Sequence, residues 1–294
     1  MPDIQLVEVS PRDGLQNEPT ILAVADKIAL VERAIAAGAR RIEVASFVNP
    51  ARVPQMADAE AVIAGLPRNS GATYIGLVLN KRGVLRALET AVDEIGLVCI
   101  ASDTFGMKNQ GQTSDESLDM ACDGLRFARE QGRSAQATIA VAWGCPFEGP
   151  TDPDRVVAMA RQLADAGSHE VALADTIGIA KPYQVEQLVI RVREAIGDVP
   201  VRVHLHDTRG MGVANGLAAI SAGATVLDAS IGGTGGCPFA PGSAGNVATE
   251  DLAYAINGGL GLDLDRLVDS AVWLNQRLGR MRTSAVTRTM RPAG

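Results

Sequence analysis

Two of the three histidines in this 294-residue sequence stand in the segment Val203-His204-Leu205-His206-Asp207. Successive side chains of an extended strand point to opposite faces, so the two imidazoles would share one face, about 6 to 7 Å apart along the strand. Two imidazoles at that spacing could hold one divalent metal ion. The alternative is a pair of hydrogen-bonded histidines that fill polar space, and an isolated pair does not decide between the two.

Polar residues also stand at the ends of other predicted strands. They are Arg12-Asp13-Gly14 after the first strand, Glu43 and Ser46 on the second, and Asp175-Thr176 after the sixth. Asp13 offers an oxygen ligand for a hard cation, and Arg12 could bind a carboxylate or a thioester oxygen that develops negative charge. The simpler interpretation of Arg12-Asp13-Gly14 is an Asp-Gly turn with a local ion pair.

The ligand types available favour one kind of metal. Carboxyl or amide oxygens with two imidazoles and waters suit Mg²⁺ or Mn²⁺ better than structural zinc, which favours a tetrahedral set with thiolates. The third histidine, His169, stands at the start of a predicted strand and therefore at the opposite end from the other two.

A cysteine, Cys237, lies in the glycine-rich stretch 230–246, directly after the eighth predicted strand. One interpretation is a lid thiol that closes over a substrate and transfers a proton. The other is a small residue packed in a glycine turn, and the loop alone favours neither.

Alternating strands and helices must position these residues. The predicted strands are 4–9, 41–47, 73–79, 94–100, 136–143, 169–174, 200–206 and 225–231. The predicted helices between them are 24–38, 57–65, 82–91, 115–131, 153–166, 183–196 and 211–222. This alternation predicts an α/β fold, and eight units are the number that closes a (β/α)₈ TIM barrel; an open doubly wound sheet is the alternative.

The barrel prediction also orients the histidine strand. Val201, Val203 and Leu205 would pack on helices, which leaves Arg202 and the two histidines inside the barrel, toward the C-terminal end where barrel active sites lie. Gly38, Gly167 and Gly223 each precede a strand and suit left-handed helix stops.

The chain is expected to form a single domain over residues 1–294. Two further helical segments, 247–257 and 263–280, follow the eighth strand. The barrel would occupy residues 1–245 and a helical C-terminal extension residues 246–294.

Composition narrows the class of protein. Hydrophobic residues make up 47% of the chain, aromatics only 3%, and there are 31 glycines, which is typical of a core of small aliphatic side chains. The net charge of −7 argues against a nucleic-acid partner.

Four cysteines without a CxxC pair indicate a reducing compartment. No apolar run approaches a membrane span and no basic-then-apolar leader is present, so we expect a cytoplasmic protein without membrane partners.

Other enzyme classes find weaker support. The segment Gly210-Met-Gly212-Val-Ala-Asn215 resembles a dinucleotide loop, with Asp228 downstream, but the third glycine is Asn and Asp228 falls in a strand. A nicotinamide oxidoreductase is therefore an alternative with an incomplete fingerprint. No GxSxG or Walker motif occurs, which sets hydrolases aside.

Taken together, the motifs resemble the hydroxymethylglutaryl-CoA lyases, metal-dependent barrel enzymes with an Arg-Asp-Gly signature after the first strand. The resembling segments are Val7–Glu18, Ile42–Val48, Val53–Met56, Gly144–Gly149, Asp175–Gly178, His204–Thr208, Gly235–Ala240 and Gly245-Asn246. The cysteine loop is the specific one, because related synthases share the Arg-Asp and His-x-His parts but lack that loop.

The resemblance implies roles for particular residues. It implies that Mg²⁺ or Mn²⁺ is held by Asp13, His204, His206 and Asn246. It implies that Arg12 stabilises an enolate oxygen, that Cys237 is the lid acid or base, and that the catalytic set also includes Glu43, Asp175 and His204. Substrate contacts are expected from Arg12, Gln16, Ser46, Lys108 and Asn109.

The implied activity is retro-Claisen cleavage of the acyl-CoA 3-hydroxy-3-methylglutaryl-CoA to acetyl-CoA and acetoacetate, a reaction of leucine degradation. The resemblance also implies a homo-oligomer, expected to be a dimer. The chain departs from the family at Pro19, where a lysine is usual, at Thr138, where a tyrosine is usual, and at Arg209 and Met211. These departures predict altered CoA contacts and an altered acyl pocket. The alternatives are a lyase for another hydroxyacyl-CoA such as citramalyl-CoA, a Claisen condensing synthase, and a non-catalytic binding barrel.

Overall fold

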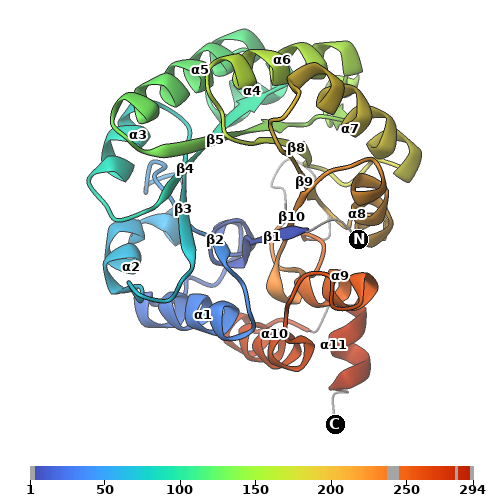
Figure 1. The fold of residues 1–294 in the computed structure, drawn as a ribbon. Coiled ribbons are helices and arrows are strands. Elements are labelled where there is room, and N and C mark those ends of the chain that lie inside the picture. Colours follow the sequence, from blue (N-terminus) through green and yellow to red (C-terminus); the bar gives the residue numbers. More distant parts are fainter. Residues whose placement is uncertain (1–3, 237–244, 282–283, 292–294) are drawn as a thin grey trace.

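Eight parallel strands close into a barrel in the computed structural model, which describes residues 4–236, 245–281 and 284–291 (Figure 1). The strands are β1 (Gln5–Glu8), β2 (Arg41–Ser46), β3 (Thr73–Val78), β4 (Glu94–Ile100), β5 (Ser134–Ala140), β8 (Val171–Asp175), β9 (Val201–Leu205) and β10 (Val226–Ala229). Around the ring they follow the order β1-β10-β9-β8-β5-β4-β3-β2, and β2 pairs with β1. The predicted TIM barrel is confirmed, and the open sheet is wrong.

Helices surround the barrel and return the chain from each strand to the next. They are α1 (Val24–Ala36), α2 (Ala59–Gly65), α3 (Lys81–Leu88), α4 (Asp103–Asn109), α5 (Ser114–Glu130), α6 (Pro153–Asp165), α7 (Pro182–Ile196), α8 (Gly212–Ser221), α9 (Thr249–Ile256), α10 (Leu264–Leu278) and α11 (Ala285–Met290). Every helix predicted from the sequence is present. Among the described helices, none combines the length and apolarity that a membrane crossing requires.

Several short elements were not predicted. They are α4, α11, the hairpin of β6 (Gly144–Cys145) and β7 (Gly149–Pro150), and the turns η1 (Ser10–Gly14), η2 (Pro54–Met56) and η3 (Ile231–Gly233). All are too short to show a hydrophobic period in the sequence.

Glycines end three of the crossover helices as predicted. Gly38, Gly167 and Gly223 have φ values of 107°, 93° and 92°. The residue after each glycine donates its N–H back into the last helical turn, as Ala39 does to the carbonyl of Ala34 at 2.9 Å. Only glycine reaches this backbone conformation without strain, so it stops the helix and turns the chain into the next strand.

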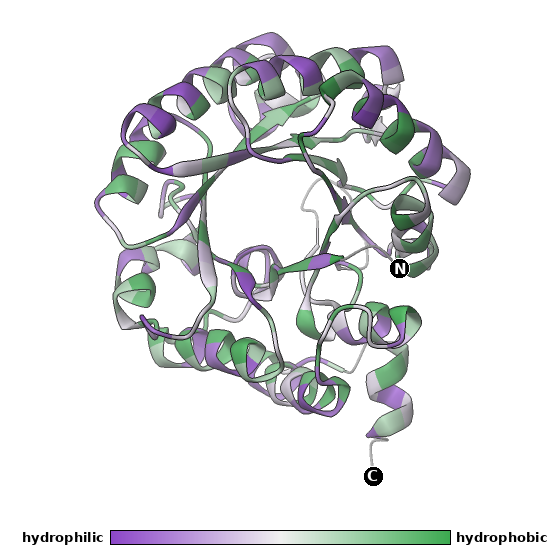
Figure 2. Ribbon diagram, in the orientation of Figure 1, coloured by the Kyte–Doolittle hydropathy of each residue, from purple (hydrophilic) through white to green (hydrophobic). Residues whose placement is uncertain are grey.

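Hydrophobic side chains fill the layer between the strands and the helices. Figure 2 shows the helices with mixed surfaces, in which hydrophobic and hydrophilic residues alternate around each helix. On β9, Val201, Val203 and Leu205 are buried in the main core cluster, while Arg202 and His204 are buried among the polar groups of the barrel interior. The predicted orientation of this strand is therefore confirmed.

The C-terminal helices complete the outer ring. Figure 1 shows α9 and α10 between α8 and α1, where α10 packs against α1, and α11 packs on their outer side. Asp251 on α9 accepts the N–H groups of Ala285 and Val286 at 3.1 and 2.8 Å, which ties the start of α11 to the ring.

Candidate active site and metal centre

A single π-helical turn, η1, carries Arg12 and Asp13 at the C-terminal end of β1. π-Helical turns are rare in proteins, and those that do occur are often found at functional sites. The turn rests on Glu8, whose fully buried carboxylate accepts the N–H groups of Ser10 and Ile231 at 2.8 and 3.1 Å and the hydroxyl of Thr249 at 2.7 Å. Burial raises the pKa of Glu8 to about 7, although these hydrogen bonds oppose the rise. Glu8 thus joins η1 to the segments that follow β10.

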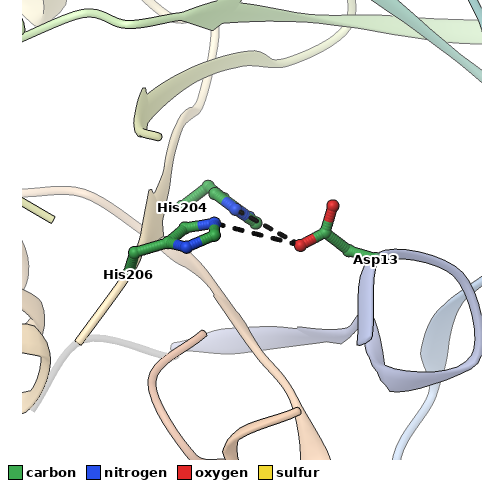
Figure 3. A group of neighbouring side chains, drawn as sticks. All are labelled: Asp13, His204 and His206. Carbon is green, nitrogen blue, oxygen red and sulfur yellow. Dashed lines mark ion pairs between the residues drawn. The ribbon is translucent and has the colours of Figure 1, made fainter. Parts of the chain in front are cut away.

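The two histidines at the end of β9 point toward Asp13 (Figure 3). Their ring centroids are 5.2 Å apart. The Nε2 atoms of His204 and His206 lie 3.9 and 4.0 Å from Oδ2 of Asp13. The sequence segments around residues 13 and 205 therefore meet at one point.

Asn246 joins this group from the segment after β10. His206 and Asn246 form an antiparallel bridge, and Val247 donates its N–H to the carbonyl of Leu205 at 3.0 Å. The Nδ2 atom of Asn246 donates to Oδ2 of Asp13 at 2.8 Å and to the carbonyl of Thr234 at 3.0 Å. Its Oδ1 atom is buried and meets no hydrogen-bond donor among the described residues.

Arg12 lies between two carboxylates. Its guanidinium donates to Oδ1 of Asp13 at 2.6 Å and also to Glu43 on β2. Burial raises the pKa of Asp13, but the charges of Arg12, His204 and His206 and the hydrogen bond from Asn246 outweigh burial and hold that pKa below its usual range. Burial raises the pKa of Glu43, and Arg12 only partly opposes the rise.

Arg12, Asp13, Glu43 and the two histidines line a cavity of about 160 Å³ at the C-terminal end of the barrel. Its polar walls include Arg12, Asp13, Gln16, Asn17, Glu43, Asn109, Thr138, Arg202, His204, His206 and Asp228. Its apolar walls include Val48, Leu77, Val98, Ile100, Phe105, Ala140 and Ala174. The cavity therefore offers both charged groups and an apolar surface to a ligand.

The residues present fit a hard divalent cation. Asp13, His204 and His206 each offer a ligand atom, and these atoms all lie within 4.8 Å of one another. The buried Oδ1 atom of Asn246 supplies an amide oxygen that lacks a donor among the described residues. One carboxylate, one amide oxygen and two imidazoles, without a thiolate, suit Mg²⁺ or Mn²⁺ better than structural zinc.

The charge of the barrel interior agrees with that fit. One connected chain of described ion pairs runs along Glu94, Arg41, Glu170, Arg202, Asp228, His204, Asp13, Arg12 and Glu43. Five carboxylates in this chain face three arginines and one histidine. Burial lowers the pKa of His204, but the hydrogen bond to Asp228 and the charge of Asp13 outweigh burial and raise that pKa. Acidic groups thus outnumber basic ones in the chain of ion pairs, which favours a bound cation.

The remaining predicted substrate contacts divide into two groups. Gln16 and Asn109 line the cavity, and Ser46 lies behind Gln16, to which its hydroxyl donates at 3.4 Å. Lys108 is not among the lining residues of the described chain, and its Nζ lies 5.1 Å from the centre of the Phe147 ring.

One predicted catalytic residue, Asp175, contacts the backbone of its own loop. Asp175 accepts the N–H groups of Ile179 and Ala180 at 3.0 and 2.9 Å, so it shapes the loop after β8 and is not among the described lining residues. Burial raises the pKa of Asp175. Cys237 lies outside the described residues.

The three departures near the predicted acyl pocket lie in different places. Thr138 lines the cavity. Arg209 instead donates to the carbonyl of Gly178 at 2.8 Å, and Met211 is exposed; neither is among the described lining residues. Of the three, only Thr138 therefore lies at the described cavity, and the altered acyl pocket stays a prediction.

Sequence reasoning missed Asp228 as part of this site. The Oδ2 atom of Asp228 lies 3.0 Å from Nδ1 of His204. The signal was an acidic residue inside a predicted strand that neighbours the histidine strand. The register that pairs Val226 with Arg202 sets Asp228 beside His204, and register cannot be read from one strand alone.

Comparisons with known proteins find similar proteins over nearly the whole chain. A family model described as HMGL-like matches residues 3–275. The (R)-citramalyl-CoA lyase of Chloroflexus aurantiacus is 42% identical and covers 95% of this chain and 92% of its own length. The 3-hydroxy-3-isohexenylglutaryl-CoA/hydroxymethylglutaryl-CoA lyase of Pseudomonas aeruginosa is 39% identical, with 98% and 97% covered. A solved HMG-CoA lyase of Acinetobacter baumannii, in complex with coenzyme A and 3-methylmalate, has a TM-score of 0.92 and 38% identity, with 99% and 96% covered.

Proposed function

The chain belongs to the HMGL-like family, and from this membership we propose that it is a metal-dependent carbon–carbon lyase that cleaves 3-hydroxy-3-methylglutaryl-CoA to acetyl-CoA and acetoacetate. The observation that carries the proposal is the convergence of Asp13, His204 and His206 beside Arg12 in one cavity, with Asn246 hydrogen-bonded to Asp13. A non-catalytic binding barrel has no need for such a set.

The proposed ligands of the cation are Asp13, His204, His206 and Asn246. A divalent cation at this place supplies Lewis acidity, which makes a substrate hydroxyl more acidic. His204 belongs to the proposed catalytic set because the resemblance to the family implies that role.

Arg12 is the proposed electrostatic catalyst. In a retro-Claisen cleavage a general base takes the proton of the tertiary hydroxyl, and a C=O bond forms at C3 as the bond between C2 and C3 breaks. The electron pair of the broken bond forms the enolate of acetyl-CoA, and C3 becomes the ketone carbon of acetoacetate. The enolate oxygen then carries negative charge, and a fixed guanidinium stabilises such charge more strongly in a partly enclosed site than in water. Glu43 holds Arg12 in place for this task.

Cys237 is the proposed acid that protonates the enolate carbon. A proton delivered there completes acetyl-CoA and prevents the enolate from recombining with the new ketone. Gln16, Ser46, Lys108 and Asn109 are the proposed contacts of the acyl-CoA, and Asp175 is proposed to hold the loop after β8.

A lyase for citramalyl-CoA is the second candidate. The observation that favours a changed acyl group is Thr138, which lines the cavity where the family commonly has a tyrosine. The (R)-citramalyl-CoA lyase of Chloroflexus aurantiacus is also more similar to this chain than the Pseudomonas aeruginosa lyase is, at 42% against 39% identity. The two substrates differ by one methylene in the acid arm, so a small change in the cavity could select between them.

The test is the release of acetyl-CoA from each acyl-CoA in parallel, with Mg²⁺, with Mn²⁺ and with a chelator. We expect metal-dependent cleavage of 3-hydroxy-3-methylglutaryl-CoA. Cleavage of citramalyl-CoA alone would keep the mechanism and assign the second substrate. If neither is cleaved, release of free CoA from acetyl-CoA and a 2-oxo acid would identify a condensing synthase.

We further propose a cytoplasmic homodimer with a role in leucine degradation. Support for a reducing compartment comes from Cys99, Cys122 and Cys145, which are buried free thiols among the described residues. Light scattering on the purified protein tests the dimer.

A further inference from the structure

A column of buried polar groups lies beneath the three clustered candidate ligands. Asp228 on β10 and Arg202 on β9 are 5% and 1% exposed. Neither is among the residues that could hold the metal, and the proposed mechanism does not use Arg202. The column therefore needs its own explanation, since buried charges are costly unless they are paired.

Asp228 meets the candidate ligand His204 from the side away from Asp13. Its Oδ2 atom lies 3.0 Å from Nδ1 of His204, whereas the Nε2 atom of the same ring faces Asp13. A proton on Nδ1 donates to Asp228 and leaves the lone pair on Nε2, where a metal ligand requires it. Carboxylates commonly fix the tautomer and orientation of metal-binding histidines in this way.

Arg202 in turn supports Asp228. Its Nε atom lies 3.5 Å from Oδ1 of Asp228 and 3.4 Å from Oε1 of Glu170, one layer deeper in the barrel. Its Nη2 atom donates to Gln136 at 2.8 Å and to Thr138 at 3.1 Å, which fixes the plane of the guanidinium. Without Arg202, the Asp228 carboxylate would lose its nearest permanent cation.

We propose that Asp228 and Arg202 are positioning residues that set the affinity of the site for its divalent cation, Asp228 by orienting His204 and Arg202 by holding Asp228. This inference rests on the metal site of the proposed function and not on the identity of the acyl-CoA. A role of Arg202 in positioning and a purely electrostatic role predict opposite effects of its removal. If only its charge mattered, removal of this cation would strengthen binding of the metal cation. If Arg202 positions Asp228, its removal weakens metal binding.

The experiment measures Mn²⁺ binding to the metal-free full chain, without acyl-CoA, by calorimetry and by the electron paramagnetic resonance signal of free Mn²⁺. We expect Asp228→Asn, which keeps the shape of the side chain, to weaken binding by roughly 10- to 100-fold. Arg202→Met is expected to weaken it as well. Should Arg202→Met fail to fold, Arg202→Lys serves instead, because one ammonium cannot meet Asp228, Gln136 and Thr138 together.

Glu170→Gln is the matched control. It removes one negative charge from the same group of ion pairs without contacting His204 or Asp228, and its amide oxygen can still face Nε of Arg202. The Mn²⁺ affinity of this variant should therefore stay close to that of the unmodified protein. A second readout is the dependence of turnover on metal concentration. In Asp228→Asn the concentration needed for half-activation should rise, while kcat at saturating Mn²⁺ should recover.

Three results would overturn the positioning proposal: unchanged affinity in Asp228→Asn, an equal loss in Glu170→Gln, or tighter binding in Arg202→Met. Failure of the unmodified chain to bind Mn²⁺ would overturn the proposed metal site and this inference together. Failure to cleave any acyl-CoA, with Mn²⁺ binding intact, would count only against the proposed substrate.

Discussion

Asp13 holds more of the site together than any single contact suggests. Its two oxygens meet Arg12, Asn246 and the Nε2 atoms of both histidines, at distances from 2.6 to 4.0 Å. The surrounding positive charges keep its pKa low against the effect of burial, so the residue is a carboxylate at neutral pH. A neutral replacement removes a ligand charge and leaves Arg12 with Glu43 alone.

We therefore expect Asp13→Asn to weaken Mg²⁺ or Mn²⁺ binding by about 100-fold or more, since a direct ligand should matter at least as much as a residue that supports one. Calorimetric titration of the metal-free protein checks this. Unchanged metal affinity would remove Asp13 from the ligand set.

A second single-residue prediction concerns Cys237, which lies outside the described residues. We expect Cys237→Ala to lower kcat by about 10² to 10⁴-fold, the usual contribution of a positioned acid or base. Metal affinity should stay near that of the unmodified protein because the thiol is not a proposed ligand. Equal turnover in the variant would end the proposed role of the thiol.

At the scale of elements, the η1 turn is fixed by close packing against the segment after β10. A Cβ atom at Gly14 would lie 2.4 Å from Oγ1 of Thr234 and 2.8 Å from Oγ of Ser230. These hydroxyls are themselves paired at 2.6 Å, so they cannot simply move aside. Only glycine permits this approach, and the turn that it permits carries Arg12 and Asp13.

Gly14→Ala should therefore displace η1, with lower metal affinity, lower kcat and a melting temperature lower by several degrees. The control is Gly71→Ala, where the backbone has φ of 72° and no atom lies within 4 Å of the added Cβ. That control should lower stability through backbone strain alone and leave metal affinity unchanged. Full metal affinity in Gly14→Ala would show that the turn tolerates the methyl group.

Glu8 beneath the same turn makes stability depend on pH. Burial raises its pKa from 4.5 to about 7, so between these pH values the folded protein keeps a proton that the unfolded chain releases. Stability contributed by protonated Glu8 is complete below pH 4.5 and is lost as the pH rises toward 7, by roughly 3 kcal/mol in total.

Glu8→Gln removes this titration while its amide oxygen can still accept both backbone N–H groups. The stability of the variant relative to the unmodified protein should rise between pH 4.5 and 7, as measured by urea unfolding at a series of pH values. A constant difference across that range would contradict the raised pKa.

Elements with a long hydrophobic period were predictable, and the turns were not. The strands and the crossover helices follow from alternating apolar runs and from glycine stops such as Gly38, whose φ of 107° agrees with its predicted role. The η1 turn and the β6–β7 hairpin depend on contacts with distant segments, such as Glu8 with Ile231, which no local pattern records.

At the scale of the whole molecule, closure of the barrel brings distant segments to one end. The sequence could predict that His204, His206 and Asp13 meet there, because parallel strands end at the same edge. It could not predict that Asp228 lies beside His204 or that Asp175 faces the backbone of its own loop, because the first depends on strand register and the second on loop geometry. His169 lies at the opposite end of the barrel, as predicted from its place at the start of a strand. Its Nε2 atom is 3.5 Å from Oε2 of Glu94.

The most direct test of the account is the rate of acetyl-CoA release from 3-hydroxy-3-methylglutaryl-CoA by metal-stripped protein as Mg²⁺ or Mn²⁺ is added back. The account predicts no release without metal, a saturable rise with metal, and no rise for Asp13→Asn at the same concentrations. Release by the stripped protein at the full rate, or equal activation of Asp13→Asn, would contradict a metal-dependent lyase site built on Asp13, His204, His206 and Asn246.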